Sequence, residues 1–115
     1  MNDPIPAIIN RIYAQTMEKS GFLWKLRIGE VDEKGFQMFI GAIEDLTSHY
    51  RERETISKLV VACLFEVPWE IENTVDHFKK KDEASGKQVS NMACRAREAI
   101  QNMLWEGLEE YYKDV

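Results

Sequence analysis

Apolar side chains recur every three to four residues along most of this sequence, and that spacing restricts the chain to helical folds more than any other feature. The clearest case is residues 85–112, where Met92 and Ile100 fall on one helical face. Ser85, with Gln88 shortly after it, is typical of a capping box that starts such a helix. No apolar run approaches the ~20 residues that a membrane-spanning helix needs. We therefore expect helices packed around one core, with no membrane segment.

The spacing and the residues that start and stop helices predict four helices. Asp3-Pro4 and Asp32 are favourable starts, because an aspartate caps the first free N–H groups and a proline fits the first turn. Pro68 removes a backbone donor inside the third helix, which should be kinked or broken there. Short loops favour antiparallel neighbours. The prediction is an all-α fold, an antiparallel up-and-down four-helix bundle in a single domain of residues 1–115, with helices near 3–19, 32–50, 52–81 and 85–112.

Residues 22–31 allow a second interpretation. Trp24, Leu26 and Ile28 alternate with charged residues, as they would in a half-buried strand. Paired with residues 36–40, this stretch could form a small hairpin, giving an α+β fold with a hairpin at about 22–40. An isolated two-stranded hairpin is only marginally stable. A helical or extended connector is therefore the preferred prediction, and the hairpin is the alternative.

Charge and cysteine content restrict the partners and the compartment. The formal net charge of −5 at pH 7 argues against nucleic-acid binding, which depends on Lys and Arg replacing the counterions of phosphates. The N-terminal residues Met1 to Pro4 lack the positive and apolar regions of a secretory signal, so we expect a cytoplasmic protein. Cys63 and Cys94 are then expected to be reduced, buried thiols rather than a disulfide.

No motif in the sequence indicates catalysis, a cofactor or a metal. His49 and His77 are the only histidines, which excludes sites with three or more histidine ligands. Asp45 and His49 are spaced as a surface pair on one helix face. The glycines match neither of the common phosphate-binding patterns. The prediction is no catalytic, cofactor-binding or metal-binding residue, and no cofactor, which favours a protein that is not an enzyme.

Several aromatic residues do not fit the predicted apolar stripes. Tryptophan and tyrosine are enriched at the centres of protein interfaces, since they bury a large area at little cost in side-chain entropy. The unequal lengths of the predicted helices also leave apolar surface that a second subunit could cover. We therefore expect a helical bundle that acts through protein–protein interaction or self-association, for instance as a homodimer, through a surface containing Trp24, Trp69, Trp105, Tyr111 and Tyr112.

Two other functions remain open. A small-ligand- or metal-binding sensor or enzyme would use polar groups in the bundle interior, because bundles do hold sites between their helices. The available groups are Asp45, His49, Glu66, Glu70 and His77. An antitoxin, immunity protein or adaptor would use the acidic surface to block a basic partner. The sequence determines neither the partner nor the oligomeric state.

Overall fold

The computed structural model describes residues 3–108, which form seven α-helices. These are α1 (Ile5–Thr16), α2 (Phe22–Arg27), α3 (Glu33–Tyr50), α4 (Lys58–Leu64), α5 (Val67–Glu72), α6 (Val75–Lys81) and α7 (Glu83–Trp105). No β-strand occurs between residues 3 and 108, which confirms the all-α prediction. The alternative hairpin at about 22–40 is wrong, because that stretch forms α2 and the first part of α3. Within this range no helix combines the length and the apolar character needed to span a bilayer.

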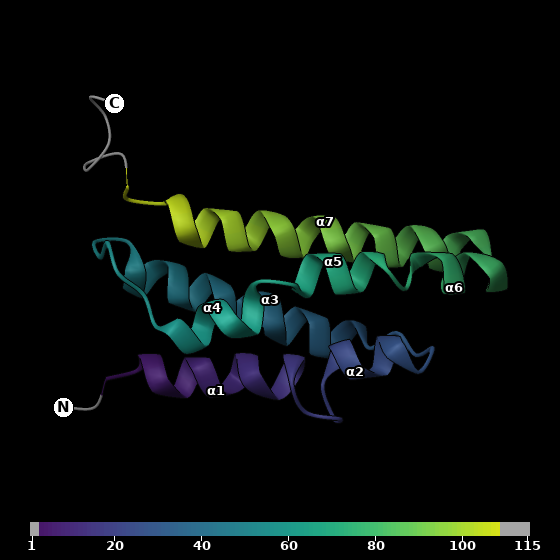
Figure 1. Ribbon diagram of the computed structural model, residues 1–115, viewed down its shortest axis with the longest axis horizontal. Helices are drawn as coiled ribbons and strands as arrows, with labels where there is room; N and C mark the ends of the chain where they lie inside the picture. The colour runs from purple at the N-terminus through teal and green to yellow at the C-terminus, as the bar shows by residue number, and fades with distance from the viewer. Residues whose placement is uncertain (1–2, 109–115) are drawn as a thin grey trace.

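The segment predicted as one helix kinked or broken at Pro68, residues 52–81, is three shorter helices, the first of which begins only at Lys58. Pro68 lies in the first turn of α5, where the missing N–H breaks no helical hydrogen bond. A second break falls at Thr74, whose hydroxyl donates to the carbonyl oxygen of Ile71 at 2.7 Å and competes with the helical pattern. Figure 1 shows α4, α5 and α6 following one another between α1 and α7.

Aspartate side chains start the two longest helices. The Oδ1 atom of Asp32 accepts from the Gly35 N–H at 2.9 Å, and its Oδ2 lies 2.9 Å from Lys25 Nζ. The Gly35 hydrogen bond first, and then that from Lys25, lower the pKa of Asp32 below its ordinary value. Asp82 accepts from the Ser85 N–H at 2.7 Å. Because Asp82 rather than Ser85 is the cap, α7 begins earlier than predicted.

Three phenylalanines are the largest fully buried side chains of the core. Phe22, Phe36 and Phe39 are each 0% exposed, and their ring centroids lie 5.0–6.1 Å apart. Gly21 lets this cluster form, because a Cβ at that position would lie 2.4 Å from the backbone carbonyl oxygen of Ala14. The turn from α1 into α2 is therefore too tight for any side chain. The buried apolar residues contributed by the helices form one cluster.

The two cysteines lie in different surroundings. Both are free; Cys63 is buried and Cys94 is exposed. Burial raises the pKa of the Cys63 thiol. The prediction of two buried thiols is therefore right for Cys63 and wrong for Cys94. The physical reason is position on α7: the buried stripe runs through Val89, Met92 and Ala96, and Cys94 lies on the outward side.

The molecule is flat, with extents of 47 × 36 × 19 Å. Helices that pack together lie about 8–10 Å apart, so the short dimension holds only about two layers. In Figure 1 α4 lies in front of α3, and it packs against α1. Among residues 3–108, no further helix consequently covers the outward side of α4.

Candidate protein-binding groove

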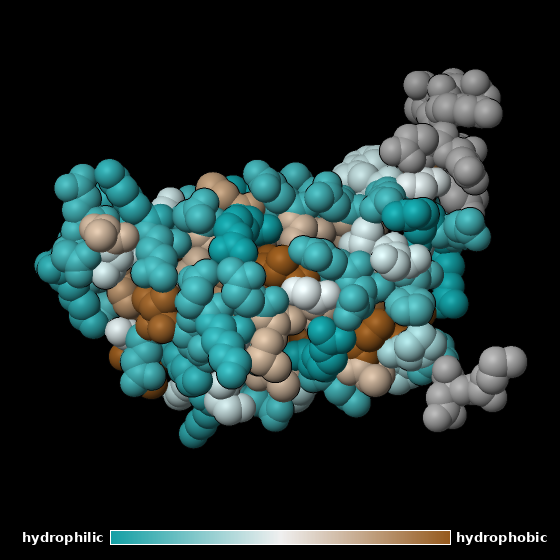
Figure 2. Space-filling model, turned by 180° about the vertical axis from the view of Figure 1, so that it is seen from behind, coloured by the Kyte–Doolittle hydropathy of each residue, from teal (hydrophilic) through white to brown (hydrophobic). Residues whose placement is uncertain are grey.

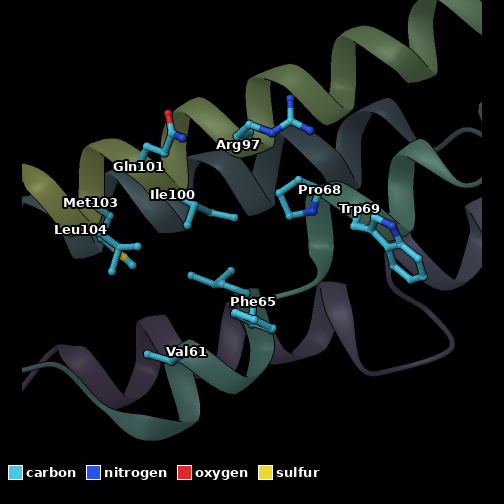
Figure 3. A pocket seen from close by; sticks show the side chains of 10 residues that line it. Val61, Phe65, Pro68, Trp69, Arg97, Ile100, Gln101, Met103 and Leu104 are labelled. Carbon is cyan, nitrogen blue, oxygen red and sulfur yellow. The ribbon is translucent and has the colours of Figure 1, made fainter.

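An apolar groove of about 390 Å³ separates α4 from the C-terminal half of α7. Its floor is formed by Leu64 and Met103, which are 2% and 4% exposed. Figure 3 shows the side chains of α4, α5 and α7 around this space. We call this space the α4–α7 groove. Its remaining lining residues are Val61, Phe65, Pro68, Trp69, Arg97, Ile100, Gln101 and Leu104.

One wall of the groove is α4, which is apolar on both of its sides. Val60, Cys63 and Leu64 point inward and are buried. The outward residues, which we call the α4 ridge, are all exposed; they are Lys58, Leu59, Val61, Ala62, Phe65 and Glu66. Phe65 is 78% exposed, although a helix that is hydrophobic all round is normally buried. Four of the six ridge residues are therefore apolar, with one charged residue at each end.

A second hollow lies on the other side of the α4 ridge. It has a volume of about 500 Å³, and its lining includes Met17, which follows α1, and Leu23 of α2. We call it the α1–α4 hollow. Val61 and Phe65 line both this hollow and the α4–α7 groove. The ridge thus stands between two depressions, a shape that can interlock with a similar ridge.

Most charges around these depressions are paired. Arg27 forms an ion pair with Glu70 beside the α1–α4 hollow. Arg97 Nη2 lies 3.2 Å from Glu72 Oε2 beside the groove. In contrast, neither Lys58 nor Glu66, the two charged residues of the ridge, belongs to any ion pair within residues 3–108. The ridge therefore carries one free positive and one free negative charge on either side of an apolar centre.

Two of the predicted interaction residues border this surface. Trp69 forms part of the groove wall and is 61% exposed. Trp105 is 65% exposed and lines a smaller hollow that shares Met103 and Leu104 with the groove. Both tryptophans are therefore adjacent to the same apolar surface, although they come from different helices.

The other predicted interaction residues are elsewhere. Trp24 is half-buried on α2 and does not line the groove; Lys19 Nζ lies 5.4 Å from its ring centroid and Arg27 Cζ lies 6.0 Å from it. Contacts of this kind hold an aromatic ring against its own chain. Tyr111 and Tyr112 lie outside the described residues.

Phe65 is the candidate surface residue that the sequence analysis missed. The signal was present, because every residue from 59 to 65 is apolar. When a run without polar residues forms a helix, one apolar side faces the core and a second apolar side faces outward. The sequence does not indicate which of the two sides the rest of the chain covers, so Phe65 could not be assigned to the surface.

The polar residues considered for a ligand or metal site do not converge. Asp45 Oδ2 lies 2.8 Å from Arg11 Nη1, and Glu70 pairs with Arg27. His77 makes an edge contact with the Phe78 ring. His49 is exposed on α3, and Glu66 is on the α4 ridge. Across the part of the chain that is described, no three His, Cys, Asp or Glu side chains are grouped so as to hold a metal ion.

Comparison with protein family models, with curated proteins and with solved structures finds no match for this chain. Function is therefore inferred from its own surface. The features that bear on function are the α4–α7 groove, the exposed and mostly apolar α4 ridge, and the two unpaired charges of that ridge within residues 3–108.

Proposed function

We propose that this chain is a non-catalytic helical protein that binds a protein partner through the α4 ridge and the α4–α7 groove. The observation that supports this most is the clustering of exposed apolar side chains. Of the ten large hydrophobic residues exposed within residues 3–108, five belong to this surface: Leu59, Val61, Phe65, Trp69 and Leu104. Contiguous apolar patches rimmed by polar residues mark interaction sites. The opposite face is mostly hydrophilic, with separate apolar patches between the polar side chains (Figure 2).

The groove also follows from how we interpret the architecture. We propose that α4, α5 and α6 together replace the third helix of an antiparallel four-helix bundle. The packing of α1 on α3 and α4, and of α7 on α3, α5 and α6, supports this arrangement. A continuous third helix would lie against α7 along its whole length. Because the helix is divided before Pro68, α4 diverges from α7 and leaves the groove between them.

A small apolar ligand is the competing occupant. The groove volume of about 390 Å³ lies within the range of about 300–1,000 Å³ typical of small-molecule sites. Such sites normally hold several converging polar groups. Here the polar lining consists of Arg97, which already pairs with Glu72, and Gln101. The polar lining is therefore too sparse to orient a ligand, and a protein surface fits the groove better.

Site-specific photo-crosslinking inside the cells that naturally make this protein tests this proposal. A benzophenone amino acid is placed at Phe65, and a matched control places it at Met38, which is 52% exposed on α3 and lines none of the depressions described above. We expect a discrete adduct with a protein at position 65, either with another chain or with a second copy, and none at position 38. Equal labelling at both positions, or no protein adduct at position 65, would reject the proposal.

A further inference from the structure

We propose that the partner is a second copy of this chain, docked with its α4 antiparallel to the first α4 about a twofold axis that passes beside Ala62. This inference rests on the proposed function and specifies its partner. In a twofold interface the same patch meets itself, so a residue at one end of the patch faces whatever lies at the other end. The α4 ridge has the composition that this symmetry requires.

The free charges of the ridge are arranged for self-pairing. Lys58 begins α4, and Glu66 follows its C-cap Phe65, whose backbone still has helical angles of φ −53° and ψ −44°. Ala62 is midway between Lys58 and Glu66 in the sequence. Antiparallel pairing centred on Ala62 therefore brings Lys58 of each copy level with Glu66 of the other, at both ends of the contact. Opposite charges that meet in this way fix the register and orientation of an interface.

The apolar part of the ridge has the same symmetry. Leu59 and Phe65 are also equidistant from Ala62, so each exposed Phe65 comes level with Leu59 of the other copy. Both are large and exposed, at 49% and 78%. The alanine at the centre has a small side chain, which lets two helices approach to the 8–10 Å separation of close packing. The pairing thus surrounds a small residue with two apolar contacts and two ion pairs.

The shape of the surface fits the same occupant. The α4 ridge stands between the α4–α7 groove and the α1–α4 hollow, which share Val61 and Phe65. When two such ridges cross, the projecting residues of each helix can enter a depression of the other, which is the usual geometry of helix packing. Phe65 and Trp69 alone can bury roughly 250–300 Å² of the ~800 Å² that each partner contributes to a standard interface.

Charge reversal tests the register. The oligomeric state of the full chain is measured by sedimentation equilibrium for the wild type, Lys58→Glu, Glu66→Lys and the double variant. We expect a wild-type dimer whose dissociation constant rises about tenfold or more in each single variant, because like charges then meet at both ends. The double variant restores opposite charges and should dimerise nearly as tightly as the wild type. Lys80→Glu and Glu98→Lys, on exposed positions of α6 and α7, are the matched controls and should not change dimerisation.

A covalent probe tests the position of the axis. Facing Cα atoms of two helices 8–10 Å apart lie about 5 Å from each other, within the range that a disulfide bridges. Ala62→Cys, made in a Cys94→Ser background, should therefore form a disulfide-linked dimer under mild oxidation. Met38→Cys in the same background should form no disulfide-linked dimer when both variants are run on denaturing electrophoresis without reducing agent. Equal cross-linking at positions 62 and 38 would reject the proposed axis.

The outcomes separate this inference from the proposed function. The antiparallel pairing is overturned if the wild-type chain stays monomeric. It is also overturned if the dissociation constant of the dimer is unchanged in the charge-reversal variants. If the photo-crosslink at position 65 then joins a different protein, the groove is still a binding site and only the second copy is rejected. If position 65 gives no protein adduct, both inferences fail together. Dimerisation lost in the single variants and regained in the double variant supports both.

Discussion

Helices α3 and α4 place their aromatic residues in opposite surroundings. On α3, Phe36 and Phe39 are 0% exposed, and the outward positions are mostly polar. At the end of α4, Phe65 is 78% exposed, and the outward side is mostly apolar. An amphipathic helix such as α3 is satisfied by one core. A helix that is apolar on both sides needs a second covering surface, and residues 3–108 cover only one side of α4.

The largest expected effect is a loss of stability on changing the buried phenylalanines of α3. Replacing Phe36 with alanine should lower the free energy of unfolding by about 3–5 kcal/mol, since it removes a ring packed against Phe22 and Phe39 and leaves a cavity. Urea denaturation followed by circular dichroism measures the change. Phe36→Leu, which keeps most of the volume, is the control and should cost less. A loss below about 1 kcal/mol would show that the phenylalanine cluster does not hold the core together.

The next largest effect on stability is expected at the N-caps of α3 and α4. Asp32→Ala on α3 should cost about 0.5–2 kcal/mol, because the Gly35 N–H loses its acceptor. Ser57→Ala removes the corresponding cap of α4, where the hydroxyl oxygen accepts from the Leu59 N–H at 3.2 Å. Both losses are measured by urea denaturation as a function of pH. They differ in mechanism, since the Asp32 cap is charged and the Ser57 cap is neutral.

The pH dependence distinguishes the two caps. The pKa of Asp32 is lowered from 3.8 in the folded chain, mainly by the Gly35 hydrogen bond and then by Lys25. A carboxylate with a depressed folded-state pKa stabilises the fold above its unfolded pKa, and this contribution is lost as the pH falls through the folded value. The difference in free energy of unfolding between the wild type and Asp32→Ala should therefore become smaller below about pH 4. The corresponding difference for Ser57→Ala should not change with pH. If both differences shrink equally, the charge of Asp32 contributes nothing to the stability of the fold.

The same contrast explains what the sequence could predict. For α3, the predicted range 32–50 nearly matches Glu33–Tyr50, because the Asp32 cap and the apolar stripe are local signals that agree. For residues 52–81, the break at Thr74 depends on which hydrogen bonds compete there, and apolar spacing continues across it. Trp69 was expected on the surface because it flanks Pro68. Phe65 was not, since only the packing of α4 on α1 shows which of its two apolar sides stays uncovered.

The smallest effect on the isolated fold is expected at Phe65, and it carries the most information. Phe65→Ser removes a side chain that is 78% exposed, so at low protein concentration the free energy of unfolding should change by no more than about 0.5 kcal/mol. At high concentration the wild type should gain stability, because dimerisation stabilises the folded state by mass action. The variant should show no such gain. Thermal unfolding over a series of concentrations measures both quantities.

The concentration series also separates two roles that one denaturation curve would merge. A Phe65→Ser variant that loses as much stability as Phe36→Ala even when dilute would mean that Phe65 holds the monomer together, and α4 would then resemble α3. If the wild type instead shows the same melting temperature at every concentration, the exposed side of α4 is not covered by a second copy. A gain confined to the wild type requires that the second apolar side of α4 be buried between chains. In that case the same seven-residue helix completes the core with one side and forms the dimer with the other.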